Sequence, residues 1–199
     1  MKERGMIFNG EMVRAILDGR KTQTRRIVSD RHLNLIDVGS QIGECYPLEC
    51  GIDHENSQSY YREHCPFGGI GDRIWVRETF GDCGVRLVYR ADADDGAKCK
   101  VERWTPSIHM PSWVSRILLE ITDVRVEKLA SVRDEDAGKE GYPADPSPYG
   151  GGMDKWLWFR QLWDGIYPEQ SFKHNPWVWV IEFKVVPNVQ ANPARPDIR

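Results

Sequence analysis

The chain has 199 residues, of which 40% are hydrophobic and eight are tryptophan, and its formal net charge is −3. This composition is enough for a packed core and excludes a disordered chain, while the slight acidity excludes a global positive field that would attract duplex DNA. No apolar run approaches the roughly 20 residues of a membrane helix, and the N-terminus lacks the apolar region of a secretory signal, so we expect a cytoplasmic protein without a membrane partner.

The first predicted element is a short helix that begins after Asn9, a residue type that caps helix N-termini well. Gly19 can end this helix in the left-handed conformation. The basic segment 19–27, "GRKTQTRRI", therefore begins where the helix stops, and we predict a loop there, because cations are favoured near the carbonyls of a helix C-terminus. The apolar positions of the helix share one face, and they are Met12, Val13, Ile16 and Leu17.

The middle of the chain alternates between insertions and strands. Residues 29–70 form a polar stretch with weak periodicity, which we expect to be a long connecting insertion. A Gly-Asp turn then leads into a strand over 73–78, and "VRLVYRAD" indicates a second strand. The two prolines of "WTPSIHMPSW" predict an irregular but ordered segment, and alternation predicts a long or bent strand over 117–126.

Two further helices and one strand are predicted after residue 130. Ser131 and Asp134 form a capping-box pattern for a helix that Gly141 terminates. A Pro/Gly-rich insertion over 142–153 leads into a helix capped by Asp154. The aromatic residues of that helix stand at core-facing spacing, and they are Trp156, Phe159 and Trp163. The segment "PWVWVIEFKVV" is the last predicted strand.

No β-α-β repetition occurs in this order of elements, which argues against a doubly wound parallel sheet. We predict a single α+β domain over 1–199, built on a mixed, mostly antiparallel β-barrel with peripheral helices. Residues 187–199 are expected to form a flexible tail.

The basic segment supplies the first candidate catalytic residues, Lys21 and Thr24. A lysine acts as a base only if its pKa falls from about 10.4, and both burial and neighbouring cations lower it. A neutral amine could then accept the proton of the Thr24 hydroxyl, as it would for a threonine nucleophile. A solvated basic turn remains the simpler interpretation of these residues alone. The neighbouring candidates for substrate binding are Arg20, Thr22, Arg25 and Arg26.

Glu140 is the third catalytic candidate. It lies in the last turn of its predicted helix, where a carboxylate opposes the helix dipole. A functional interpretation makes it the partner of Lys21, and an ordinary surface glutamate is the alternative.

Further candidates for substrate binding come from the first strand and the proline-flanked segment, and they are Trp75, Arg77, Glu78, His109 and Trp113. Aromatic and arginine planes stack bases in proteins that bind single-stranded nucleic acid. In the alternative interpretation the tryptophans belong to the core and Arg77 pairs with Glu78 or another acid.

The chain has five cysteines, an odd number at irregular spacing, which fits reduced thiols better than a disulfide framework. Five residues could in principle supply zinc ligands, and they are Cys45, Cys50, His54, His64 and Cys65. No C-x₂-C pair occurs and the gaps match none of the usual zinc spacings, so we predict no metal and no cofactor.

Several of these segments, taken in order, resemble an ASCH domain: the short helix running into "GRKTQTRR", the "GD" strand, the helix ending in "EDAGKEG" and the strand "WVIEFK". ASCH domains belong to the PUA-like superfamily of small mixed β-barrels associated with RNA. The fuller pattern of "WVRETF", "YRAD" and "WTPSIHMPSWVSRI" is similar to the larger ASCH proteins of enterobacterial phages and prophages. The resemblance extends from about Met6 to Val186.

The resemblance implies a metal-independent amidohydrolase that removes the acetyl group from N4-acetylcytidine, with Lys21, Thr24 and Glu140 as catalytic residues and Arg26 beside them. Thr24 would attack the acyl carbonyl, neutral Lys21 would take its proton, and Glu140 would orient Lys21 and assist the leaving amine. Because other family members bind or cleave RNA, the alternatives are an RNA-binding module or a ribonuclease. The expected ligand is a nucleoside or single-stranded RNA, and a phage accessory protein that binds a host protein stays open.

Overall fold

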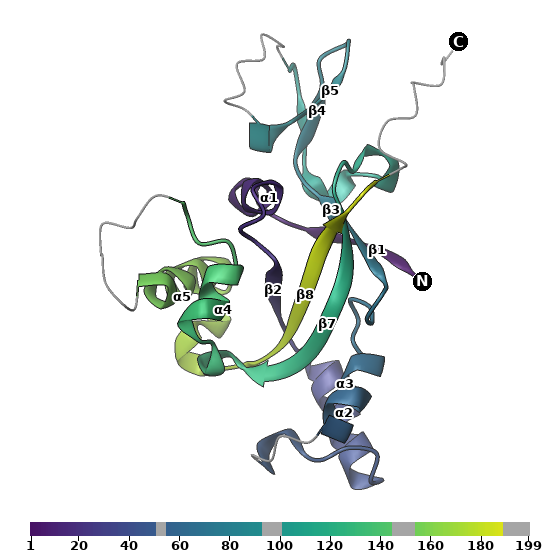
Figure 1. Ribbon diagram of the computed structural model, residues 1–199, viewed down its shortest axis with the longest axis vertical. Coiled ribbons are helices and arrows are strands. Elements are labelled where there is room, and N and C mark those ends of the chain that lie inside the picture. The colour runs from purple at the N-terminus through teal and green to yellow at the C-terminus, as the bar shows by residue number, and fades with distance from the viewer. Residues whose placement is uncertain (51–54, 93–100, 145–153, 189–199) are drawn as a thin grey trace.

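The computed structural model describes residues 1–50, 55–92, 101–144 and 154–188. Its centre is a five-stranded sheet of order β1-β3-β7-β8-β2, in which the long strands β7 and β8 lie side by side in Figure 1. The strands are β1 (Glu3–Ile7), β2 (Gln23–Ile27), β3 (Arg73–Arg77), β7 (Leu118–Lys128) and β8 (Trp177–Val186). Only β1 and β3 pair in parallel among these strands. The predicted α+β class with mostly antiparallel pairing is therefore confirmed.

The sheet curves until its two edge strands approach each other. A register shift between Ile121 and Asp123 of β7 marks a bulge, a feature that increases the bend and twist of a strand. At the edges, the Arg26 side chain of β2 donates from Nη2 to the carbonyl oxygen of Ile7 in β1 (3.1 Å) and lies over the Phe8 ring. A side chain rather than a backbone ladder therefore joins β1 to β2 in the described residues, which gives a barrel-like shape.

Alternation along β8 separates two hydrophobic cores. Trp179 and Ile181 point to the main core, which also receives residues of β1, α1, β3 and β7. Val178 and Val180 point to the opposite face and pack in a second core with residues of α4 and α5. Both faces of β8 are consequently covered, which explains its nearly continuous apolar sequence.

Helix α1 (Gly10–Leu17) forms as predicted. The Asn9 side chain accepts a hydrogen bond from the Met12 amide (2.8 Å), and Gly19 follows the helix with a φ of 72°. The apolar stripe is wrong in one position, because Ala15 joins the buried face and Leu17 is 50% exposed. Met12, Val13 and Ile16 pack in the main core, so the buried face of α1 is centred away from Leu17.

The basic segment is not the predicted loop. Residues 23–27 form β2, which pairs with β8, and Lys21 forms an isolated antiparallel bridge with Glu140. The charged residues at successive positions hid this strand, since a half-buried strand normally alternates polar with apolar residues. Ion pairs with acidic residues of neighbouring elements allow these cations to lie in a strand.

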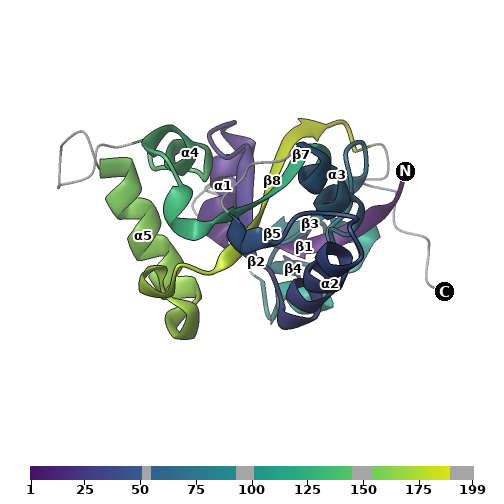
Figure 2. The same ribbon diagram turned by 90° about the horizontal axis from the view of Figure 1, so that it is seen from below.

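The polar stretch 29–70, expected to be a long connecting insertion, contains helices that were not predicted from the sequence. Helices α2 (Asp30–Gln41) and α3 (Glu55–Glu63) occupy much of it, and Ile36 and Tyr61 are buried in the main core. Figures 1 and 2 show this pair at one end of the sheet, away from α4 and α5. Only a few apolar side chains of α2 and α3 contact the core, so the helical periodicity of their sequence is weak. Packing against the rest of the protein stabilises these two helices. Strand β1 was also not predicted from the sequence.

A second, three-stranded sheet of order β5-β4-β6 extends from one end of the molecule. Its strands are β4 (Phe80–Asp82), β5 (Leu87–Tyr89) and β6 (Trp104–Thr105). The predicted strand in "VRLVYRAD" is therefore shorter than expected and ends in a 3-10 turn over Arg90–Asp92. The segment "WTPSIHMPSW" contains short 3-10 turns after its prolines, as an irregular but ordered segment should.

Helices α4 (Asp134–Lys139) and α5 (Asp154–Ile166) pack together over the second core. The predicted burial of Phe159 and Trp163 is confirmed. The capping box is wrong, because Ser131 lies in a preceding 3-10 turn and Arg133 occupies the N-cap position. Gly141, with a φ of 104°, follows the C-cap residue Glu140 and ends the helix as predicted.

Two predicted segments fall almost entirely outside the described residues, namely the 142–153 insertion and the 187–199 tail. The expectation of reduced cysteines is wrong at Cys83, which is disulfide-bonded, while Cys45, Cys50 and Cys65 are free. Irregular spacing cannot exclude a bond between cysteines that the fold brings together. Within the described ranges, no helix has both the length and the apolar character needed to cross a membrane.

Candidate active site

Lys21 enters the interior where the chain passes from α1 to β2. Its backbone amide donates to the carbonyl oxygen of Ala15 (2.9 Å), and its side chain has no exposed surface. The Nζ atom donates to Glu140 Oε2 (2.8 Å), the Glu140 carbonyl oxygen (2.9 Å) and the Gln23 carbonyl oxygen (2.8 Å). Three acceptors match the three N–H groups of an ammonium, so the resting lysine is held in its charged form.

The same burial makes this ammonium a better proton donor than an exposed lysine. Desolvation lowers the pKa of Lys21 below its ordinary value of 10.5, and it outweighs the opposing effect of the Glu140 carboxylate. The charges of Arg26 and Arg25 lower the pKa further. The lysine therefore has the two properties of an acid–base group: a fixed position and a proton that leaves more easily.

Glu140 lies between two cations. It is 3% exposed, and its Oε1 accepts from Arg25 Nη1 (3.0 Å) while its Oε2 accepts from Lys21. Arg25 in turn lies 3.7 Å from a carboxylate oxygen of Glu127 and 3.9 Å from one of Asp136. The predicted contact of Lys21 with Glu140 is confirmed, and the surrounding ion pairs fix its geometry.

Thr24 lies apart from this pair. The period-two alternation of β2 places Thr24 and Arg26 on the face opposite to Gln23 and Arg25. The Thr24 hydroxyl is buried and accepts a hydrogen bond from Arg26 Nη1 (2.9 Å). No hydrogen bond joins Thr24 to Lys21 in the described structure, so the fold brings together two of the three catalytic candidates.

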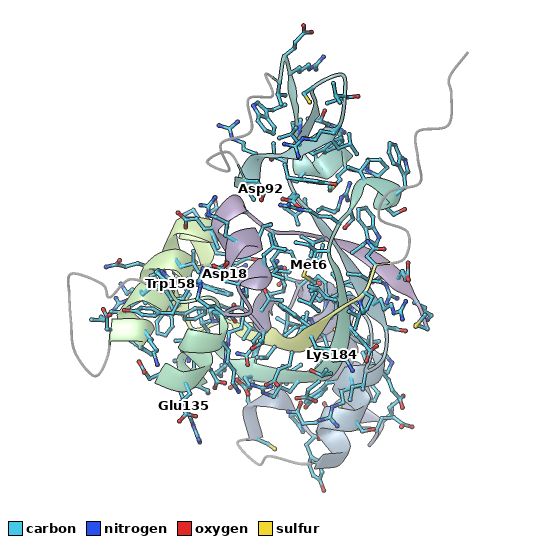
Figure 3. The ribbon with its side chains drawn as sticks, turned by 45° about the horizontal axis from the view of Figure 1, so that its top comes forward. Met6, Asp18, Asp92, Glu135, Trp158 and Lys184 are labelled. Atoms are coloured by element: carbon cyan, nitrogen blue, oxygen red, sulfur yellow. The ribbon has the colours of Figure 1, made fainter. Side chains whose placement is uncertain are left out.

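A cavity of about 480 Å³ opens beside Glu140, and we call it the Glu140 cavity. It is lined by Asn9, Glu11, Met12, Arg14, Asp18, Arg20, Glu140, Gly141, Pro143, Ala144, Trp158 and Leu162. Figure 3 labels two of these lining residues, Asp18, which follows α1, and Trp158 of α5. The Trp158 ring meets the Tyr142 ring edge-to-face, with centroids 5.6 Å apart. Lys21 does not line this cavity, whereas Glu140, the acceptor of one of its hydrogen bonds, does.

Arg20 and Thr22, two predicted substrate-binding residues, mainly stabilise the chain around the cavity. Arg20 Nη1 donates to the carbonyl oxygens of Gly141 (3.1 Å) and Tyr142 (2.8 Å), and Nη2 donates to Asp18. Thr22 is exposed, while its backbone links the end of α4 to β8. Of the two, only Arg20 borders the Glu140 cavity.

The strand residues Trp75 and Arg77 form a separate outer cluster. Arg77 lies over the Trp75 ring (5.2 Å) and donates to the carbonyl oxygen of Ile108. The ring passes so close to Gly5 that a Cβ there would lie 2.6 Å from it. His109 is exposed and Trp113 is 56% exposed, so these residues do not border the Glu140 cavity.

Glu78 belongs to a second cavity, of about 580 Å³, which we call the Glu78 cavity. It is lined by Ile7, Phe8, Asn9, Gly10, Glu11, Arg14, Glu78, Thr79, Arg90, Ala91 and Ser107. Arg116 holds both Glu78 oxygens (2.9 and 3.1 Å) and also binds Asp92. Burial raises the pKa of Glu78, and the Arg116 cation opposes that shift.

Four residues of these sites were not predicted from the sequence, and they are Arg116, Asp92, Arg14 and Trp158. A buried glutamate needs a cationic partner, which was a usable signal for Arg116. The alternative interpretation paired Arg77 with Glu78 or another acid; instead Glu78 pairs with Arg116, and Arg77 donates to the carbonyl oxygen of Ile108. The position of Trp158 depends on how α5 packs, which no local pattern reveals.

The cysteines and histidines considered as zinc ligands do not form a common site in the described part of the chain. No group of three or more His, Cys, Asp or Glu residues there could hold a metal ion, and His54 lies outside the described residues. His64 stacks on Tyr60 with ring centroids 4.2 Å apart. Burial raises the pKa of the Cys65 thiol to about 11, which makes it unreactive near neutral pH.

Comparisons with known proteins give similarity in structure only. No family model matches the sequence, and no curated protein matches it. Among solved structures, an ASCH domain from Lactobacillus crispatus JV V101 is 15% identical, with a TM-score of 0.45 and coverage of 94% of this chain and 81% of that one. A protein of the DUF984 family from Enterococcus faecalis V583 is 12% identical, with a TM-score of 0.44 and coverage of 94% and 77%.

Proposed function

We propose that this chain is an amidohydrolase that removes the acyl group from the N4 atom of an acylated cytidine-like base. The principal observation is the position of Glu140, which borders a cavity while Lys21 and Arg25 hold its two oxygens. A carboxylate fixed in this way, with an ammonium of lowered pKa behind it, supplies an acid–base unit at a ligand-sized space.

The Glu140 cavity suits a nucleoside. Its volume of about 480 Å³ lies in the range of small-molecule sites. Trp158 offers an aromatic surface to a base, and the polar groups of Asn9 and Arg20 can orient a sugar or an acyl oxygen. A nucleoside has a flat base that packs on apolar atoms and a sugar that needs hydrogen-bond partners, and this cavity offers both kinds of surface.

The reaction consumes one water molecule. Glu140 accepts a proton from water as the water oxygen bonds to the acyl carbon, which gives a tetrahedral oxyanion. The C–N4 bond then breaks, N4 receives the proton from Glu140, and the products are a cytidine-like amine and a carboxylic acid. Lys21 acts through Glu140, because its ammonium donates to the carboxylate and orients it before the attack.

Thr24 is the alternative nucleophile, on the basis of the sequence resemblance. Its hydroxyl would have to leave Arg26 Nη1 and reach the acyl carbon from the other face of β2. We therefore assign the attack to water and assign Thr24 a positioning role through Arg26.

A purely RNA-binding role for the basic segment is less well supported. Lys21 and Arg25 are buried and paired with carboxylates, so neither cation is available to a phosphate. Removing either cation from its partner would leave an uncompensated charge in the interior, which costs about 3–5 kcal/mol.

The proposal is tested by incubating the purified chain with N4-acetylcytidine and identifying the products by mass spectrometry. We expect cytidine and acetate from the wild type, and a loss of about 10²–10⁴ in rate for Glu140→Gln. Glu135→Gln is the matched control, because Glu135 is an exposed acidic residue of α4, the helix that Glu140 follows, and it does not line the cavity, so it should retain most activity. Absence of products with the wild type would contradict the proposal.

Thr24→Val separates the two nucleophiles in the same assay. Water attack predicts that Thr24→Val keeps measurable turnover, and that a rapidly quenched wild-type reaction contains no acetylated protein. Complete loss in folded Thr24→Val, together with acetyl-Thr24 in the quenched wild type, would assign the attack to Thr24.

A further inference from the structure

Helix α2 presents a row of apolar side chains to solvent. Leu35 is 38% exposed, Val38 is 53% exposed, and Ile42, the C-cap residue of the helix, is 69% exposed. Their spacing of three and four residues places them on one face of the helix. Single exposed apolar residues are ordinary on a protein surface, whereas a row of three on one helix is typical of a helix that packs against another helix.

The row begins one turn earlier, at Arg31, which lies four residues before Leu35. With Arg31 included, the members follow one another at intervals of four, three and four residues, which is the spacing of the contact row in a two-helix coiled coil. The aliphatic part of an arginine side chain can cover apolar surface while its charged end stays in water. Exposed polar residues flank the row, and they are Asn34 and Gln41.

The two ends of the row carry charges of opposite sign. Arg31 is exposed near the N-terminal end of α2, and Glu44 is exposed just after the C-terminal end, where Gly43 adopts a φ of 81°. Neither Arg31 nor Glu44 forms an ion pair with another described residue. The last turn of α2 contains no basic residue, so the helix itself supplies no cation to its C-terminal carbonyls.

We propose that this row is the contact surface of a homodimer, in which α2 of one subunit lies antiparallel on α2 of a second copy of the chain. The apolar residues of the two copies meet at the centre. Each Arg31 lies beside the C-terminal end of the other helix and beside Glu44 of the partner subunit. A parallel pair would bring the two arginines together, where like charges repel.

A second copy suits this surface because a two-fold axis brings the same patch of both subunits together. A row with a cation at one end and an anion at the other is complementary to itself only in the antiparallel orientation. Figure 1 shows α2 and α3 together at the lower end of the molecule. No residue of α2 lines the Glu140 cavity or the Glu78 cavity, so the contact surface is separate from both cavities.

The size of the surface indicates a reversible dimer. A standard interface buries about 800 Å² per partner, and one helix about 18 Å long with three apolar side chains offers less than that. We therefore expect a dissociation constant in the micromolar range.

Sedimentation equilibrium of the full chain across the micromolar range tests the apolar centre. The average mass of the wild type should rise from that of one chain toward that of two, and Leu35→Lys and Val38→Lys should each weaken the dimer at least tenfold. Leu157→Lys is the matched control, because Leu157 of α5 is also 38% exposed and should not affect association. Lysine forms helices at least as well as leucine and valine, and thermal melts check that each variant is folded.

Charge reversal tests the orientation. Arg31→Glu and Glu44→Arg each place like charges opposite one another in the antiparallel dimer, so each should weaken it about threefold to tenfold at low ionic strength. The double variant Arg31→Glu/Glu44→Arg should restore the affinity of the wild type, since both contacts again join opposite charges. In a parallel dimer the double variant would not restore affinity.

A wild type that stays monomeric across this range would overturn the proposal. A dimer that Leu35→Lys and Leu157→Lys affect equally would also overturn it, because its contact surface would then lie elsewhere. Single charge variants that bind as the wild type does, or a double variant that stays weak, would overturn the antiparallel arrangement of α2.

Discussion

Lys21 combines full burial with three acceptors and one carboxylate partner. Removing an ammonium and a carboxylate from water costs several kcal/mol per ion, and their attraction offsets this only when the geometry and the remaining hydrogen bonds are good. The Glu140–Arg25 contact supplies part of that compensation. An apolar pair of similar volume would hold α4 against β2 as well, so stability alone does not account for these two residues.

The lowered pKa of Lys21 predicts a specific dependence of stability on pH. Above the folded pKa and below 10.5, the unfolded chain binds more protons at this residue than the folded chain, so the contribution of Lys21 to the free energy of unfolding rises with pH. Lys21→Met removes this contribution. Urea unfolding at several alkaline pH values should give a difference between wild type and Lys21→Met that grows with pH across this window, and a constant difference would contradict the assigned shift.

The sequence allowed the Lys21–Glu140 contact to be predicted because the family resemblance placed both residues. The sequence did not reveal on which face of β2 the Thr24 side chain lies. That face depends on where β2 begins, and this segment was expected to be a loop. Arg25 was expected to bind the substrate, but its side chain is buried and forms an ion pair with Glu140.

At the scale of elements, the turn between α1 and β2 places Lys21 next to Glu140. Gly19 adopts a φ of 72°, and the next two amides both donate to the carbonyl oxygen of Ala15. This turn was predictable, because an N-cap, an apolar stripe and a terminal glycine are local signals. The helices α2 and α3 were not, because their amphipathic character is weak and their packing depends on distant strands.

A pair of glycine substitutions tests the role of this turn. Gly19→Ala should destabilise the protein by roughly 1–2 kcal/mol, because a side chain is strained in the left-handed conformation. Gly165→Ala is the control: Gly165 lies in α5 with open space around its Cβ position, and alanine there should be neutral or stabilise by about 0.5–1 kcal/mol. Equal effects of the two substitutions in chemical unfolding would show that the left-handed turn does not matter.

At the scale of the whole molecule, the curved sheet holds α1 between two cavities and places the second core behind α4 and α5. The net charge of −3 and the internal pairing of Lys21 and Arg25 both favour a small substrate over a long polyanion. Element order predicted the α+β class with antiparallel pairing. It could not predict the cavities, which depend on side chains from segments far apart in the sequence.

The central claim is that the Lys21–Glu140 pair catalyses hydrolysis of an acylated cytidine, and kcat/KM for N4-acetylcytidine tests it most directly. Lys21→Met preserves the approximate volume but removes the cation that orients Glu140, and Lys21→Arg keeps a cation at this position. Lys139→Arg is the control, because Lys139 is the neighbouring, 48% exposed lysine. With thermal melts showing all variants folded, we predict a loss of about 10²–10⁴ for Lys21→Met, a smaller loss for Lys21→Arg, because a cation still faces Glu140, and near wild-type turnover for Lys139→Arg. Wild-type turnover by Lys21→Met would contradict the account.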